Sequence, residues 1–206
     1  MPRPINRAAR GTWIALRLML IFTVLLGVAY PLLVTGIGQL AFPWQANGSP
    51  LRGGEDDRVV GSALLGQSFS DADGKPLRQY FQPRPSAAGN GYDAAQSGGS
   101  NLGPESPELV QLIGERKAQV AEFNGVPESR VPVDAVTASG SGLDPDISSA
   151  YARLQVRRVA EARGLPQAEV ERLVARHTSG PDLGFIGEAR VHVVELNLAL
   201  DEAEQP

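Results

Sequence analysis

One uncharged apolar stretch near the start of the chain, Leu18–Phe42, constrains the fold more than any other feature of the sequence. A stretch of this length is what a single helix needs to cross a bilayer, because only a helix satisfies its own backbone polar groups in hydrocarbon. We expect a transmembrane helix over residues 13–42, preceded by a segment of residues 1–12. The chain after it would form a tether, residues 43–58, and one domain, residues 59–206.

The charged residues on either side of this stretch predict its orientation. Four arginines and no acidic residue precede it, whereas basic and acidic residues are mixed after it. The positive-inside bias therefore places the N-terminus in the cytoplasm and the C-terminal domain outside the cell membrane. The residues concerned are Arg3, Arg7, Arg10 and Arg17 before the stretch, and Arg52, Glu55, Asp56, Asp57 and Arg58 after it.

A cleaved signal peptide is the alternative for this segment. Signal peptides have an apolar region of typically ~7 to 15 residues that ends in a small-x-small cleavage site. The present run is longer and ends in Phe42, Pro43 and Trp44, which favours an anchor that is not cleaved.

Small or weakly polar residues recur every four positions within the stretch, at Thr23, Gly27, Pro31 and Thr35. This spacing places them along one stripe of a helix, where another membrane helix can approach closely. The same residues are also ordinary in membrane helices. Two interpretations therefore stay open: the stripe packs against another membrane helix, or these residues have no specific function.

The remainder of the chain is acidic. All 23 acidic residues lie after Phe42, together with all but four of the 19 basic residues, so this part carries a net charge of −8. Such a charge argues against nucleic acid or anionic lipid as its ligand. There is no cysteine, and the two histidines, His177 and His192, lie outside any HExxH pattern, so we expect no metal site.

Apolar spacing and turn residues predict one mixed α+β domain after the membrane helix. The expected helices run from Pro107 to Phe123, from Asp144 to Gly164 and from Pro166 to His177. The expected strands are Val59–Phe69, Val131–Ser139 and Val191–Leu200, the last with a phase slip at Val193 and Val194.

The segment Gln82–Pro107 is rich in glycine and has no hydrophobic period, which is typical of a flexible loop. Larger residues nevertheless stand between the glycines in a non-repeating order. One hypothesis is therefore an ordered loop that faces a partner, and the alternative is a flexible one. The partner-interface candidates of this segment are Arg84, Tyr92, Asp93, Ser100, Asn101 and Leu102.

No motif of a known catalytic site is present. Lys75 is followed by Pro76 and not by Ser or Thr, which excludes a Walker A loop, and the GSG at residues 140–142 lacks the spacing of a nucleophile elbow. The arginines around Gly164 are mixed with glutamates, which favours a solvated surface over a DNA-reading helix pair. An accessory subunit is therefore favoured, and a membrane-anchored enzyme or binding protein that acts alone is the alternative.

Several segments, in order along the chain, resemble the C subunit of the Kdp family of potassium-transporting ATPases. They are FPWQANGS from Phe42, GSALLGQSF from Gly61, YFQPRPSAAGNGYDAAQSGGSNLGP from Tyr80, VPVDAVTASGSGLDPDIS from Val131, LQVRRVAEARGL from Leu154 and ELNLALD from Glu195. The resemblance implies a single-pass protein of the bacterial cell membrane. It also implies three partners: a pore-forming A subunit, an ATP-hydrolysing B subunit and a small F peptide.

The resemblance implies that the chain binds no cofactor by itself, since ATP and K⁺ are bound at the level of the complex. It also implies two roles for such a chain. In the first role the external domain packs on the pore subunit and stabilises the assembly. In the second the chain is a catalytic chaperone that raises the ATP affinity of the hydrolysing subunit, with Gln155 contacting the nucleotide. Because ATP is cytoplasmic, an external domain would have to transmit such an effect as coupling free energy. The topology therefore favours the first role.

Overall fold

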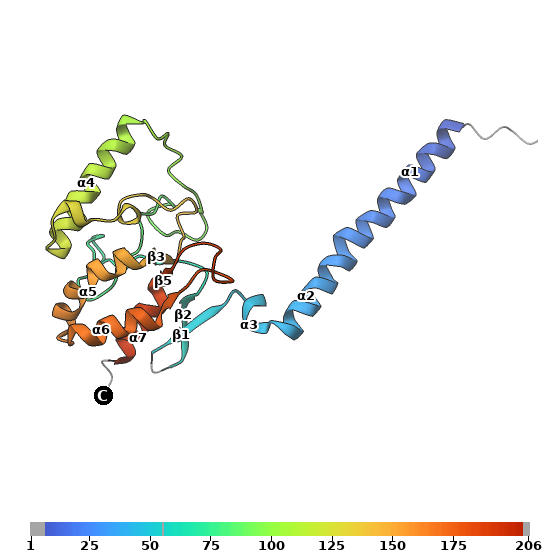
Figure 1. The fold of residues 1–206 in the computed structure, drawn as a ribbon. Helices are drawn as coiled ribbons and strands as arrows, with labels where there is room; N and C mark the ends of the chain where they lie inside the picture. The colour runs from blue at the N-terminus through green and yellow to red at the C-terminus, as the bar shows by residue number, and fades with distance from the viewer. Residues whose placement is uncertain (1–6, 55, 204–206) are drawn as a thin grey trace, which may run out of the picture. The chain divides into compact units, whose positions relative to one another are not determined.

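A computed structural model describes residues 7–54 and 56–203 of the chain (Figure 1). The chain divides into two compact units, Met1–Ser49 and Pro50–Pro206, which are described separately below. Arg3 and Glu55, on which part of the orientation prediction depends, lie outside the described residues.

The first unit is one long apolar helix followed by a short one. Residues Ala9–Ala41 form a helical run of 33 residues that is long and apolar enough to cross a membrane. At 1.5 Å per residue the run is about 50 Å long, which exceeds the ~30 Å of a hydrocarbon core. The predicted apolar helix is thus confirmed. Its parts are α1 (Arg7–Val24), the π-helical η1 (Leu25–Ala29) and α2 (Tyr30–Ala41), and α3 (Pro43–Ala46) follows.

The π-helical turn has a local cause in Pro31. Proline has no N–H to donate, and its ring clashes with the carbonyl group four residues earlier, which belongs to Gly27. The backbone N–H of Tyr30 donates to the carbonyl oxygen of Leu25, five residues earlier, so the turn before the proline is widened. Gly27 lies in this wide turn.

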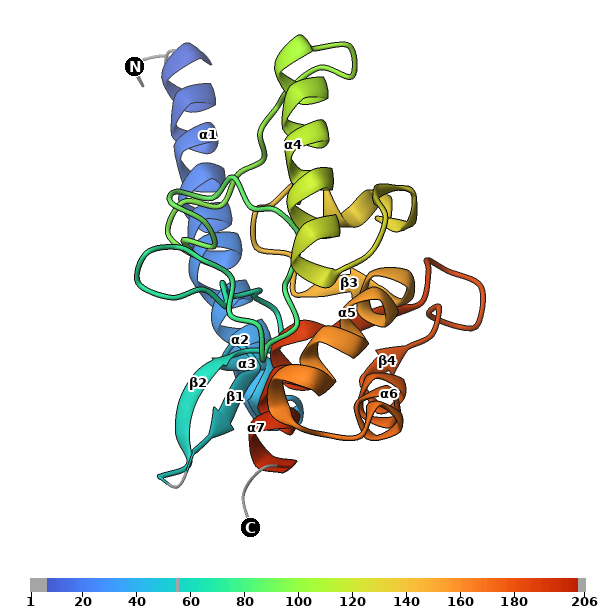
Figure 2. The ribbon, with the colours of Figure 1, turned by 90° about the vertical axis from the view of Figure 1, so that its left-hand side faces the viewer.

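The second unit contains two small antiparallel sheets (Figure 2). The first is a hairpin of two strands. The second has three strands in the order β3-β5-β4, so that β5 lies in the middle and pairs with both neighbours. The strands are β1 (Pro50–Gly53), β2 (Arg58–Ser62), β3 (Asp146–Ser148), β4 (Thr178–Ser179) and β5 (Arg190–His192).

Over residues 50–54 and 56–203, four α-helices and two short 3-10 helices complete this unit. Helices α5, α6 and α7 lie together beside the three-stranded sheet in Figure 1, and the core is formed mainly by their apolar faces with β3, β5 and the buried Phe81. The helices are α4 (Pro107–Asn124), η2 (Glu128–Arg130), η3 (Val133–Ala135), α5 (Ser149–Arg163), α6 (Gln167–Arg176) and α7 (Val193–Ala203).

The predicted α+β class and two of its helices are confirmed. Helix α4 begins at Pro107 after the N-cap Ser106, and Gly125 ends it in the left-handed region with φ 64°. Pro166 is the N-cap of α6, which ends before His177. Proline at a helix start and glycine at a helix end both act through the local backbone, so the sequence alone predicts where these helices begin and end.

The strand predicted over Val191–Leu200 is wrong beyond its first residues. Strand β5 ends at His192, and the chain continues as helix α7. The phase slip at Val193 and Val194 marks this change. The apolar pattern that predicts an alternating strand is in fact a helical pattern. The buried residues of α7 follow helical spacing; they are Val193, Val194, Leu196, Asn197 and Leu200.

The strand predicted over Val131–Ser139 is also wrong. The 3-10 helix η3 occupies the middle of this segment, where Pro132 has no N–H for a sheet ladder. Asp134 instead accepts hydrogen bonds from the backbone N–H and the hydroxyl of Ser148, at 2.7 and 2.9 Å. The segment therefore supports the start of α5.

Two further boundaries differ from the predictions. The strand predicted over Val59–Phe69 ends at Ser62, and the helix predicted from Asp144 begins only at Ser149. Ser148 is the N-cap, and its Oγ accepts a hydrogen bond from the N–H of Tyr151 at 3.0 Å. Part of the predicted tether is ordered as α3 and as strand β1, which pairs with β2.

We expect Gly142→Ala to lower the free energy of unfolding by more than about 1 kcal/mol, because this residue has φ +68° and a Cβ there would lie 2.7 Å from the carbonyl oxygen of Gly98. The matched variant is Gly114→Ala in the middle of α4, where nothing lies within 4 Å of a new Cβ. It should raise stability by roughly 0.5–1 kcal/mol. Urea unfolding of the full chain in mild detergent measures both free energies. Equal effects of the two variants would contradict the strained, close-packed position of Gly142.

Candidate functional site

No strand among the described residues pairs with the segment Arg78–Gln82, and side chains of α5 and α7 take the place of one. The backbone N–H of Phe81 donates to Oδ1 of Asn197 at 2.9 Å, and Nδ2 of Asn197 donates to the carbonyl oxygen of Phe81 at 3.0 Å. Asn197 is 1% exposed. One buried amide thus satisfies both backbone groups of one residue.

Gln155 of α5 does the same for the next residue. The N–H of Gln82 donates to Oε1 of Gln155 at 2.7 Å, and Nε2 of Gln155 donates to the carbonyl oxygen of Gln82 at 3.0 Å. Gln155 is 0% exposed. Burial of these amides is tolerated because their hydrogen bonds are made.

Two arginines of α5 hold the rest of the segment. Arg163 donates from Nε to the carbonyl oxygen of Gln79 at 2.7 Å and pairs with Asp201 of α7 at 2.7 Å. The guanidinium of Arg158 is buried and lies 4.5 Å from the ring centre of Phe123. It donates to the carbonyl oxygens of Arg78 and Tyr80, to Oε1 of Gln155 and to Oδ1 of Asn124.

We call this group, Gln155, Arg158, Arg163 and Asn197 around Arg78–Gln82, the backbone clamp. Burial lowers the pKa of Arg158 to about 10, which leaves the guanidinium charged at neutral pH. Its charge is met by carbonyl dipoles and by the face of Phe123. The solvated surface predicted for the arginines around Gly164 is wrong for two of them, since Arg158 is 1% exposed and the side chain of Arg163 is 2% exposed. Neither Arg158 nor Asn197 was predicted to be buried, although both are polar residues at apolar phases of their helices.

The predicted nucleotide contact of Gln155 stays a prediction. Both polar atoms of its amide are engaged, with Gln82 and with Arg158. A nucleotide would have to open the backbone clamp to reach this side chain.

The glycine-rich segment is an ordered loop, and Arg84 and Tyr92 hold it in place. Arg84 donates from Nη1 to Oδ2 of Asp144 at 2.8 Å, and Tyr92 donates from its hydroxyl to the carbonyl oxygen of Arg84 at 2.7 Å. Burial raises the pKa of the Tyr92 phenol, so it remains a donor at physiological pH. The loop is thereby joined to the segment that precedes β3.

The other predicted loop residues differ in their surroundings. Asp93 is partly buried and forms a local turn, accepting from the N–H of Ala95 at 2.9 Å and from Nε2 of Gln96 at 2.7 Å. Ser100 and Asn101 are exposed, and Leu102 is partly exposed. These three residues therefore face solvent in the isolated chain, while Arg84, Tyr92 and Asp93 stabilise the loop.

The predicted stripe of the membrane helix is exposed along its length in the isolated chain. Gly27, Pro31 and Thr35 are all exposed, and nothing lies within 4 Å of a Cβ built at Gly27. The stripe is thus available to another helix, although its contacts remain a prediction.

An acidic groove of about 350 Å³ lies where the loop meets β3 and β5. Three of its carboxylates have partners: Asp144 pairs with Arg84, Asp146 pairs with Arg190, and Asp134 binds Ser148. The fourth, Glu188, is exposed. Within residues 7–54 and 56–203 no group of three or more His, Asp or Glu residues is arranged to hold a metal ion. The groove is lined by Arg84, Asp134, Asp144, Asp146, Ile147, Ser148, Glu188, Ala189 and Arg190.

A Ser–His–Asp sequence of contacts crosses all three strands of the larger sheet. Ser179 Oγ of β4 lies 3.2 Å from Nε2 of His192 on β5, whose Nδ1 lies 2.6 Å from Oδ1 of Asp146 on β3. The angles of the second contact depart from those of a hydrogen bond, and Asp146 is shared with Arg190. A base in a nucleophilic triad needs an aligned carboxylate, so we assign this group to holding the short strands together.

The charge of His192 depends on these neighbours. The contact with Asp146 raises the pKa of His192 above its ordinary value, and the nearby Glu195 acts in the same direction. Partial burial and the charge of Arg190 oppose this rise. The protonated ring therefore stabilises the folded domain.

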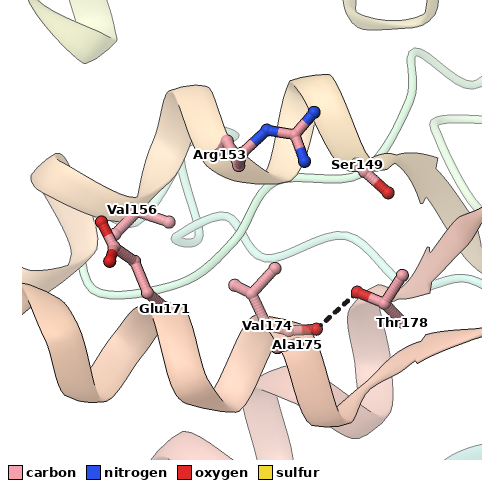
Figure 3. A pocket seen from close by; sticks show the side chains of 7 residues that line it. All are labelled: Ser149, Arg153, Val156, Glu171, Val174, Ala175 and Thr178. Atoms are coloured by element: carbon pink, nitrogen blue, oxygen red, sulfur yellow. Dashed lines mark hydrogen bonds between the residues drawn. The ribbon is translucent and has the colours of Figure 1, made fainter.

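A larger cavity of about 540 Å³ lies between α5 and α6 (Figure 3). Figure 3 shows that its lining comes from two facing helices and from Thr178 of β4, with the exposed Arg153 on α5 and the exposed Glu171 on α6. Val156 and Val174 are buried and make its floor apolar. None of the predicted site residues lines this cavity, so it belongs to neither the loop nor the backbone clamp.

Comparisons with known proteins give one consistent family. The family model described as "KdpC: K+-transporting ATPase, c chain" matches residues 12–202. The chain is 55% identical over 183 residues to the potassium-transporting ATPase KdpC subunit of Beijerinckia indica, covering 89% of each chain. It is 53% identical to the KdpC subunit of Mycobacterium bovis, covering 91% of this chain and 95% of the relative. It is 55% identical to that of Caulobacter vibrioides, covering 93% of each.

We expect Arg158→Met to lower the free energy of unfolding by at least about 3 kcal/mol, because several buried acceptors would lose their donor. Arg157→Met is the matched control, since this neighbouring side chain is 72% exposed and pairs with Glu161 in the i,i+4 arrangement. Its effect on the free energy of unfolding should be much smaller, because exposed ion pairs contribute little to stability. Urea unfolding measures both variants, and similar losses would show that the clamp does not stabilise the domain.

We also expect a pH-dependent contribution from His192. Because the pKa of His192 is raised in the folded state, its contribution is complete below the unfolded value near 6.5 and is lost as the pH rises through the folded value. His192→Asn should therefore cost up to about 1 kcal/mol at low pH and less at high pH. Urea unfolding of wild type, His192→Asn and Asp146→Asn between about pH 5.5 and 8.5 tests this. A constant difference would contradict it.

Proposed function

The chain belongs to the KdpC family of potassium-transporting ATPase subunits, and on that premise we propose that it is a non-catalytic subunit that assembles and stabilises the transporting complex. The observation that carries the proposal is the use of its polar side chains. Gln155, Arg158 and Asn197 hold the domain's own backbone, as described for the backbone clamp. Such a domain would contribute a fixed surface on which other subunits can pack, and its buried polar groups would not take part in catalysis.

The acidic groove supports the same conclusion. A chain that bound K⁺ or a divalent cation by itself would offer several free oxygen ligands. Asp134, Asp144 and Asp146 are instead engaged with serine, arginine and histidine side chains. Selection and transport of potassium would then be carried out by other chains, with K⁺ and ATP bound at the level of the complex.

The membrane helix would contribute a second contact with those chains. Its stripe of Gly27, Pro31 and Thr35 is exposed, and close packing of small residues is a main source of helix association in lipid. The partners of this proposal are a pore-forming A subunit, an ATP-hydrolysing B subunit and a small F peptide in a bacterial cell membrane. The N-terminus is placed in the cytoplasm and the domain outside, from the arginines that precede the apolar stretch.

An effect of this chain on ATP affinity would be indirect under the proposal. ATP is cytoplasmic, the domain is placed outside, and Gln155 is buried within the backbone clamp. The effect would therefore be a coupling free energy transmitted through the assembled subunits. Arg84, Tyr92 and Asp93 would support it by keeping the loop in one conformation, and the exposed Ser100 and Asn101 with Leu102 would meet a partner.

Purification of the tagged chain in mild detergent should bring the other subunits with it. The complex without this chain should show a raised KM for ATP, and addition of the purified chain should lower the KM to the value of the full complex. Calorimetry of the chain alone should give no saturable ATP binding. Arg157→Met is the control, since this exposed position should change none of these results. A chain that purifies alone, with saturable ligand binding or activity of its own, would instead support a membrane-anchored protein that acts by itself.

A further inference from the structure

The connection between β4 and β5 carries three large apolar side chains that do not reach the core. Leu183 is 82% exposed, Phe185 is 77% exposed and Ile186 is 51% exposed. Single exposed apolar residues are ordinary, but three within four positions form a patch. We call these three residues the apolar tip.

The apolar tip is held in a defined conformation. Asp182 and Ile186 exchange backbone hydrogen bonds of 2.8 and 2.9 Å, and Phe185 donates to the carbonyl oxygen of Asp182 at 3.3 Å. Leu183 has a φ of 53°, a region that costs free energy for a residue with a side chain. The loop therefore keeps its apolar side chains in solvent through a strained but hydrogen-bonded turn.

The charges around the apolar tip are mainly acidic. Asp182 and Glu188 are exposed beside it, and Arg190, the next cation along the chain, is shared between Asp182 at 3.6 Å and Asp146 at 3.3 Å. An anionic lipid surface would repel this arrangement, because loops that bind such surfaces carry excess basic residues. Charge complementarity fits a protein surface with basic groups around an apolar pocket.

In Figure 2 the connection between β4 and β5 projects from the second unit on the side opposite to the β1–β2 hairpin. The hairpin therefore does not cover the apolar tip, which agrees with the exposure of Leu183, Phe185 and Ile186.

We propose that the apolar tip, Leu183, Phe185 and Ile186, inserts into an apolar pocket with a basic rim on another subunit of the potassium-transporting ATPase. The proposal rests on the proposed function and adds to it the surface that makes the contact. A small group of aromatic and aliphatic side chains in a pre-formed turn is the kind of anchor that carries most of the binding energy in an interface.

The experiment places a photoreactive benzoylphenylalanine at Phe185 in the full chain, within membranes that contain the whole complex. The same substitution at Val133, which is 74% exposed on η3, is the matched control. Illumination should join the chain to one partner subunit from position 185 and not from position 133. A cross-link to lipid alone, or none at position 185, would overturn the proposal.

A second variant tests the energetics. Leu183→Ser with Phe185→Ser should lower the amount of co-purifying partner by about tenfold or more, whereas Leu64→Ser with Val110→Ser, at positions 60% and 63% exposed, should leave it unchanged. Thermal unfolding should be the same for both double variants, since none of these side chains is buried. If wild type brings its partners and the tip variant does so equally, this inference fails while the proposed function stands. If wild type brings none, the proposed function fails.

Discussion

The second unit depends on the way in which buried amide and guanidinium groups satisfy a backbone segment that no strand accompanies. Within Arg78–Gln82 the residue Phe81 is fully buried, and a buried backbone group without a partner would cost roughly 1–3 kcal/mol. Gln155 and Asn197 meet both groups of Gln82 and Phe81, and Arg158 meets two further carbonyl groups. Helices α5 and α7 are thereby connected through the segment that lies between them.

The same solution recurs where regular structure is short. The glycine-rich loop is fixed by Arg84 and Tyr92, and the strands of two or three residues are joined by Asp146, Ser179 and His192. Side chains thus replace the ladders that longer strands would supply. The polar groups named here therefore stabilise the fold of the second unit.

In the part of the chain that the structure describes, two apolar surfaces are notable for their exposure. One is the exposed helix with Gly27, Pro31 and Thr35, and the other is the apolar tip between β4 and β5. Lipid accounts for most of the helix surface, but it accounts for neither the strained turn at Leu183 nor the acidic residues beside it. A multi-subunit assembly would explain both features with one partner set.

The sequence alone determined the elements whose cause is local. The apolar helix follows from an uncharged run, and α4 follows from Ser106, Pro107 and Gly125, each acting within one turn. The tertiary structure decided the rest. Phe81 and Asn197 are 116 residues apart in the chain, so their pairing leaves no local pattern, and a buried Gln155 is indistinguishable from an exposed one by spacing. Helix α7 also depends on this context. Its valines favour a strand by local propensity, but only a helix places Asn197 and Leu200 on the same buried face.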